Sequence, residues 1–234
     1  MARRPRNDKP PEDTPQLPTP SKSNRERIVE AFVALLAEQP FEKIGFGDLA
    51  ARCGLSLADC RAEFASTMGV LAAHVKEIDH KVLSGGQGDM AEEPPRERLF
   101  DVLMRRLETL APERAAIRSL LRSAARNPGL ALALNGLAVR SQQWMLTAAD
   151  IDASGPRGLI RAQGLALLYA RVVRVWLHDD DPGLARTLAA LDRELARGQR
   201  WAGFLDDLCR FAPRCRRRRR RDRSRYGDEE PAAV

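Results

Sequence analysis

Helical periodicity is the feature that most constrains how this chain can fold. Apolar residues recur every three or four positions along most of it, and no segment alternates apolar with polar residues as a half-buried strand does. Ala, Leu, Arg and Glu, which are strong helix formers, dominate the composition, while aromatic residues make up only 5%. We therefore predict an all-α protein of about nine or ten helices.

Breaks in this periodicity divide the chain into four parts. Residues 1–20 contain six prolines and are expected to form a disordered arm. Helical patterns resume at Ser21 or Ser23, either of which can cap the first helix. A stretch rich in glycine, proline and acidic residues (84–95) then separates a small unit, residues 21–83, from a larger one, residues 96–209. One helix alone is expected to connect these units, and residues 210–234 form a predicted disordered, arginine-rich tail.

The small unit carries a helix-turn-helix pattern. A short helix fits Phe46 to Cys53, and Gly54 follows it where a helix end favours a left-handed residue. Ser56 can cap the next helix, which runs to about Phe64. A turn this short holds two helices at a steep angle, so that the second can enter the major groove of DNA.

Asn24 to Leu71 resembles the N-terminal module of the TetR family of bacterial regulators. The resemblance rests on these core and turn residues: Ile28, Ala31, Phe32, Leu35, Phe41, Asp48, Leu49, Ala50, Gly54, Ser56, Phe64 and Leu71. It implies a TetR-like all-α fold, with a three-helix DNA-binding unit followed by a larger helical bundle that binds ligand and forms a homodimer through its last two long helices. The residues then expected to face DNA are Lys43, Ser56, Leu57, Ala58, Arg61 and Thr67.

Several of these positions depart from the family pattern. The recognition helix has Arg61 where the family usually has tyrosine, and the next helix begins with Thr67 in place of a phosphate-binding lysine. Asp59 and Glu63 add negative charge, so that residues 21–83 carry a net charge of −1. Because neutralising phosphates supplies most non-specific DNA affinity, a helix-turn-helix that has lost DNA contact remains an alternative.

A second resemblance covers parts of the larger unit. Trp176-Leu177, the acidic residues 179–181 and the sequence Leu191-Asp192-Arg193 are similar to the lipid-binding family of coenzyme Q biosynthesis, which is itself TetR-like in fold. This similarity implies the alternative function, a ubiquinone-biosynthesis accessory protein that binds isoprenoid lipid, serves a hydroxylase and does not bind DNA.

Inward-facing side chains of the larger unit could converge around a hydrophobic ligand. The candidate pocket consists of Leu103, Leu107, Leu120, Leu137, Trp144, Leu167 and Trp176. The same periodicity is equally compatible with residues that only fill a core.

The positive charge of the chain is concentrated at its C-terminal end. Residues 210–225 hold ten arginines and one aspartate, whereas residues 28–209 have a net charge of −2. The arginine tail could contact nucleic-acid phosphates or the anionic headgroups of a membrane.

No catalytic, cofactor or metal-binding pattern is recognisable. The four cysteines lack C-x-x-C spacing, and nucleotide-binding, hydrolase and zinc-protease motifs are absent. Because these motifs are absent, we expect a protein that is not an enzyme and needs no cofactor or metal. Because no secretory signal is recognisable, we expect it to be cytoplasmic. The predicted function is a ligand-sensing DNA-binding regulator. The alternatives are the lipid accessory protein and a nucleic-acid-associated protein bound through its tail.

Overall fold

The structure, a computed structural model, describes residues 22–85 and 92–211, with side chains placed up to Arg200. Within these ranges all regular structure is helical, as predicted. The elements are α1 (Asn24–Glu38), η1 (Phe41–Lys43), α2 (Phe46–Cys53), α3 (Leu57–Glu63), α4 (Thr67–Ser84), α5 (Pro95–Thr109), η2 (Ala111–Glu113), α6 (Arg114–Arg126), α7 (Pro128–Ala148), α8 (Gly155–Trp176) and α9 (Ala185–Phe211). The predicted arm lies outside the described residues, as does the predicted tail beyond Phe211.

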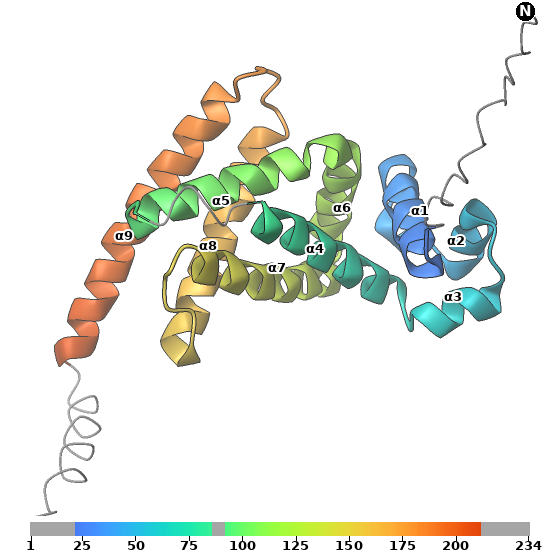
Figure 1. The fold of residues 1–234 in the computed structure, drawn as a ribbon, viewed down its shortest axis with the longest axis horizontal. Helices are drawn as coiled ribbons and strands as arrows, with labels where there is room; N and C mark the ends of the chain where they lie inside the picture. The colour runs from blue at the N-terminus through green and yellow to red at the C-terminus, as the bar shows by residue number, and fades with distance from the viewer. Residues whose placement is uncertain (1–21, 86–91, 212–234) are drawn as a thin grey trace, which may run out of the picture.

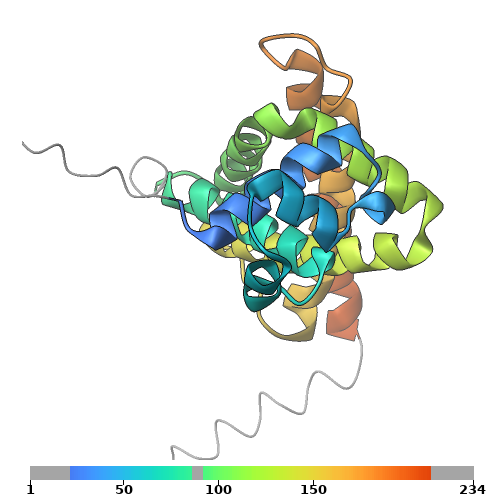
Figure 2. The same cartoon turned by 90° about the vertical axis from the view of Figure 1, so that its right-hand side faces the viewer.

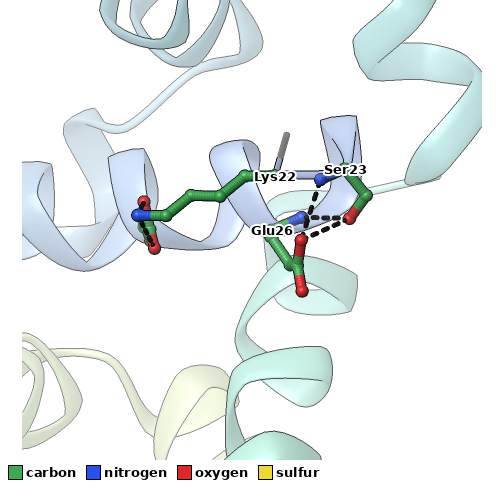
Figure 3. Close-up of polar contacts among 4 residues, drawn as sticks. Lys22, Ser23 and Glu26 are labelled. Atoms are coloured by element: carbon green, nitrogen blue, oxygen red, sulfur yellow. Dashed lines mark hydrogen bonds and ion pairs between the residues drawn. The ribbon is translucent and has the colours of Figure 1, made fainter. Parts of the chain in front are cut away.

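The helix starts follow the capping chemistry expected from the sequence. Ser23 caps α1: its hydroxyl accepts the backbone N–H of Glu26, whose carboxylate accepts the backbone N–H of Ser23 at 2.8 Å (Figure 3). Ser56 and Ser66 cap α3 and α4 through backbone N–H groups three residues later. These local bonds explain why the starts of α1, α3 and α4 were predictable.

The first three helices gather at one end of the molecule, and the long helices α5 to α9 form the remainder (Figure 1). Two hydrophobic cores correspond to these parts. Ile28, Phe32 and Leu49 belong to the first core, whereas Leu103, Leu107 and Trp176 belong to the second. Helix α4 contributes to both, because Leu71 is buried in the first core and Ile78 in the second.

The expectation that one helix alone joins the two units is wrong. Helix α6 packs along α1, as the end-on view of Figure 2 also shows. Ala116 of α6 is buried in the first core, and Leu120 and Leu137 pack against that core as well. The N-terminal unit therefore rests on the helical bundle through α6 in addition to its covalent link through α4.

The last helix also differs from expectation. The leucine stripe over residues 184–195 and the apolar residues after position 200 predicted two helices, but the structure has one helix, α9. Leu184 lies just before it with a φ of 51°. No proline lies near residue 200, and the two glycines there, Gly198 and Gly203, are separated by four residues, so the helix continues through this stretch.

Candidate nucleic-acid interface and buried polar core

The turn between α2 and α3 is held in place by backbone geometry and one arginine. Gly54 ends α2 with a φ of 63°, in the left-handed region that glycine adopts at little cost. Arg27 of α1 donates from Nη2 to the carbonyl oxygen of Cys53 at 2.6 Å, which satisfies one of the free carbonyls at the end of α2. Cys60, on the inner face of α3, is fully buried and anchors this helix to the first core.

The outer face of α3 is exposed to solvent. Leu57 is 59% exposed, and Ala58 and Arg61 are exposed as well. Ser56 is exposed at the start of this helix, where its hydroxyl donates to Asp59 at 2.6 Å. Hydrogen bonds from the side chain and backbone of Ser56 lower the pKa of Asp59, so this carboxylate stays charged at neutral pH.

The other two predicted DNA-facing residues lie on neighbouring elements. Lys43 is exposed in η1, immediately before α2, and Thr67 is half-buried as the first residue of α4. All six predicted residues are thus at least partly accessible. Whether they contact DNA stays a prediction.

Ion pairs occupy several of the basic groups in this part of the molecule. Lys22 pairs with Glu30 at 2.6 Å, and Arg52 pairs with Glu38. Arg25 lies over the ring of Phe64, 4.6 Å from its centroid. These contacts reduce the positive charge available to a polyanion. Within the described parts of the chain, Lys43 and Arg61 form no ion pair, which leaves their charges accessible.

The seven predicted pocket residues do not converge on one space. Leu103, Leu107 and Trp176 are buried together in the second core, whereas Leu120 and Leu137 pack against the first. The expectation that Trp144 and Leu167 face inward is wrong, because their exposed fractions are 59% and 53%. On α7 the buried residues Gln142 and Met145 flank Trp144, which therefore points away from the core.

The sequence reasoning missed a polar cluster inside the second core. Asp79 of α4 forms an ion pair with Arg106 of α5 and accepts a hydrogen bond at 2.7 Å from the hydroxyl of Ser141 on α7. The guanidinium carbon of Arg106 lies 5.9 Å from the ring centroid of Tyr169 on α8. All four side chains are buried. Side chains from four helices therefore surround one buried ion pair. Because these residues are far apart in the sequence, no short motif predicts the cluster.

Two atoms of this polar cluster lack a partner among the described residues: Arg106 Nε and the Tyr169 hydroxyl oxygen. Burial is the main cause that raises the pKa of Tyr169, so the group remains a protonated phenol at physiological pH. The phenol can both donate and accept a hydrogen bond, and its interaction with the Arg106 side chain opposes the effect of burial on this pKa.

Neither a metal site nor a membrane span is found in the described parts of the chain. Residues 22–85 and 92–211 contain no group of three or more His, Cys, Asp or Glu side chains that could hold a metal ion. None of the described helices combines the length and the apolar character needed to cross a bilayer.

Comparisons with solved structures identify the fold. A TetR transcriptional regulator from Nitrosomonas europaea ATCC 19718 superposes with a TM-score of 0.60, at 22% identity, over 76% of this chain and 99% of the other. The chain has the TetR fold. A TetR regulator from Rhodococcus sp. RHA1 gives a TM-score of 0.53, at 21% identity over 74% of this chain and 94% of its own. A TetR-family regulator from Streptomyces coelicolor gives 0.52, at 13% identity, covering 80% of this chain and 86% of the other.

Sequence comparisons alone do not reach this result. No protein-family model matches the chain, and no curated protein matches it. The chain therefore resembles TetR proteins far more in the arrangement of its helices than in its amino-acid sequence. The helix-turn-helix pattern and its caps were the part of the sequence in which the TetR resemblance could be recognised.

Proposed function

We propose that the chain is a DNA-binding transcriptional regulator that responds to a hydrophobic small molecule and acts as a homodimer. The observation that carries the proposal is the geometry of α2 and α3 within a TetR fold: a tight turn at Gly54, a capped α3, and an outer face with Leu57, Ala58 and Arg61 open to solvent. A helix presented in this way fits the major groove.

The residues around α3 would make different kinds of contact with DNA. Arg61, whose side chain is long and whose charge is accessible, is suited to a base edge or a phosphate. Lys43, Ser56 and Thr67 lie at or before helix starts, where backbone N–H groups also favour phosphates. The net charge of −1 over residues 21–83 predicts weak non-specific binding by this unit, so that the arginine tail would supply most of the salt-dependent affinity.

The second core is the proposed ligand-binding part. It contains Leu103, Leu107 and Trp176, three of the predicted pocket residues. Helix α4 runs from this core to α3, and His74 of α4 contacts Glu113 of η2 at 2.7 Å. A ligand that shifts α4 or α6 would consequently change the orientation of α3.

The outer faces of α8 and α9 are the proposed dimer surface. Ile160 and Leu167 of α8 and Leu188 of α9 are exposed apolar residues. The two helices are held side by side by an ion pair between Arg171 and Glu194 at 3.1 Å. Exposed large apolar residues clustered on adjacent helices are typical of an interface.

DNA selection with the full chain tests the proposal. The protein is used to enrich sites from a random duplex pool, and fluorescence anisotropy then compares the enriched site with random DNA over a range of salt. Arg61→Ala should weaken binding to the enriched site by about 1–3 kcal/mol if Arg61 reads a base edge. The matched control, Arg140→Ala, removes the same charge from an exposed position on α7, outside the α8 and α9 faces, and should bind like the wild type.

A second variant separates the two sources of affinity. A chain ending at Leu208 should weaken binding to all sequences and flatten the salt dependence, because it removes ten arginines. Failure to enrich any site, with the full chain binding all DNA equally, would refute the regulator function. It would favour the alternatives, a lipid accessory protein or an association through the tail alone.

A further inference from the structure

An open groove of about 670 Å³ lies where α7 ends and the loop to α8 begins. Among the described residues that line it, Asp150 and Asp152 are the only charged ones, and Trp144 contributes the largest side chain. We call it the α7–α8 groove. It lies outside the proposed DNA interface, and its volume is in the range of pockets that hold ligands, about 300–1,000 Å³.

The side chains of the α7–α8 groove suit a guanidinium group. Trp144 is 59% exposed, so much of its indole is available for a cation to stack on. Hydrogen bonds from the side chain and backbone of Ser154 lower the pKa of Asp152, which is therefore charged at neutral pH. Arginine combines both contacts, because its planar guanidinium stacks on aromatic rings and binds carboxylates through two N–H groups.

Arginines of the folded chain approach these aspartates but leave them open to solvent. Arg98 of α5 donates to Asp150 at 3.3 Å, yet the side chain of Asp150 is still 81% exposed. Asp152 is exposed as well, and Arg161 donates to its backbone carbonyl oxygen at 3.0 Å. Ion pairs this exposed contribute about 1 kcal/mol at most, so a further arginine can share or replace them.

The arginine-rich tail begins on the side of the molecule where this groove lies. Helices α8 and α9 run antiparallel: Arg171 pairs with Glu194, and a Cβ atom added to Gly198 would lie 3.5 Å from Leu168. Continued in this register, α9 ends at Phe211 on the side where α8 starts, and both views show these two helix ends at the same end of the molecule (Figures 1 and 2).

The tail is long enough to reach the groove. Six consecutive arginines, residues 216–221, begin five residues after Phe211. Five extended residues span about 16–18 Å. Because a short tether gives an effective concentration in the millimolar range, even weak contacts between the tail and the groove would be populated.

We propose that the arginine run 216–221 docks in the α7–α8 groove of its own chain, with one guanidinium on the indole of Trp144 and others on the carboxylates of Asp150 and Asp152. This docking needs no DNA and is independent of the proposed function. Its consequence rests on that function: a docked tail is withheld from phosphates, so the groove competes with DNA for the arginines. The competition would weaken binding to random DNA, which depends most on the tail.

Limited trypsin digestion of the full chain measures the docking, because trypsin cleaves after arginine and reaches a docked tail more slowly. Loss of the tail is followed by intact-mass spectrometry. Trp144→Ala removes the indole, and a double variant, Asp150→Asn with Asp152→Asn, removes both charges. Asparagine suits position 150, where φ is 59°, and keeps a side-chain oxygen for the bonds from Ser154.

Matched controls make equivalent changes outside the groove. Leu132→Ala shortens an apolar side chain that is 74% exposed on α7. Glu108→Gln with Asp180→Asn removes two exposed acidic charges elsewhere. Neither control alters a trypsin site, and both should lose the tail at the wild-type rate.

Both groove variants should lose the tail about threefold to tenfold faster than the wild type at low salt. This difference should disappear in about 1 M NaCl, where charges are screened within about 3 Å. It should not depend on protein concentration, because the contact is within one chain. Equal cleavage of the wild type and both groove variants would refute the docking. Protection that rises with protein concentration would assign the groove to the tail of a second copy and would also overturn the proposal.

Binding to random duplex DNA tests the competition. Trp144→Ala, which changes no charge, should bind random DNA at least threefold more tightly than the wild type. The gain should vanish in a full-length background that carries all six changes from Arg216→Gln to Arg221→Gln. Unchanged affinity of Trp144→Ala would refute the competition. A protein that protects its tail but enriches no DNA site refutes the regulator function alone, whereas one that enriches a site but leaves its tail unprotected refutes the docking alone.

Discussion

The hydroxyl oxygen of Ser123 on α6 accepts a hydrogen bond at 3.2 Å from the backbone N–H of Phe41, which follows α1. One turn earlier on α6, the Ser119 hydroxyl donates at 3.1 Å to the carbonyl oxygen of Gln39. Both serines are buried. The segment between α1 and α2 therefore obtains two of its backbone hydrogen bonds from the helical bundle, and these bonds fasten the DNA-binding unit to the part proposed to bind ligand.

Removing the Ser123 hydroxyl should weaken this attachment. Ser123→Ala leaves the N–H of Phe41 without its partner in a half-buried position, so the free energy of unfolding is expected to fall by about 1–2 kcal/mol. Urea denaturation followed by circular dichroism measures the change. Ser84→Ala, at an exposed position on α4, is the matched control and should stay within about 0.5 kcal/mol of the wild type. Equal stability of the two variants would show that water replaces the serine.

These serines also show where sequence reasoning reached its limit. Helical spacing places Ile117, Leu120, Leu121 and Ala124 on the apolar side of α6, yet the positions most deeply buried on this helix are Ala116, Ser119 and Ser123. Helix α6 lies between both cores and therefore has more than one buried face. Helical periodicity identifies one apolar face per helix, so it does not predict that a second face carrying serines is buried as well.

The same limit explains the error at Leu167. Helix α8 is apolar around most of its circumference near this residue, and spacing alone does not show which side meets the core. The helix-turn-helix, by contrast, was predictable because its signals are local: Gly54 ends α2 and Ser56 caps α3 only two residues later. The ion pair of Asp79 with Arg106 depends on the packing of α4 against α5, which no local pattern encodes.

The start of α8 depends on a close approach that only glycine permits. A Cβ atom added to Gly158 would lie 2.0 Å from the carbonyl carbon of Ala153, so the loop before α8 would have to move. Gly158→Ala should lower the free energy of unfolding by about 2–3 kcal/mol. Gly136 on α7 has open space around its added Cβ, and Gly136→Ala should raise that free energy by about 0.5–1 kcal/mol. Thermal unfolding of both variants measures the contrast, and a stabilised Gly158→Ala would contradict the close approach.

Acid should weaken the start of α9 through Asp179. Its carboxylate accepts the hydroxyl and the backbone N–H of Thr187 at 2.6 and 2.8 Å, and the hydroxyl bond is the largest cause that lowers the pKa of Asp179. A carboxyl whose pKa is lower in the folded chain stabilises it above the unfolded pKa of about 4, and this contribution is lost as the pH falls through the folded pKa.

Substitution isolates that contribution. Asp179→Asn should be less stable than the wild type at neutral pH, and the difference should shrink as the pH falls below about 4. Urea denaturation between neutral and acidic pH measures it. The control is Asp180→Asn, at the exposed neighbouring position, which should follow the wild-type curve. A constant difference for Asp179→Asn at every pH would indicate that its effect does not come from the charge.

The proposed dimer surface leads to a prediction about Leu167. Its side chain is 53% exposed and lies on the same helix as the exposed Ile160, so a charge at this position is tolerated in the monomer but is buried without a partner in a dimer. Leu167→Glu should therefore keep the helical content of the wild type and weaken self-association by at least tenfold in dissociation constant, about 1.4 kcal/mol. Sedimentation velocity over a range of concentrations measures the association. Trp144→Glu introduces the same charge at a similarly exposed apolar position on α7, outside the α8 and α9 faces, and should leave self-association unchanged. If Trp144→Glu dissociates the protein and Leu167→Glu does not, the interface includes α7 and the assignment to α8 and α9 is wrong.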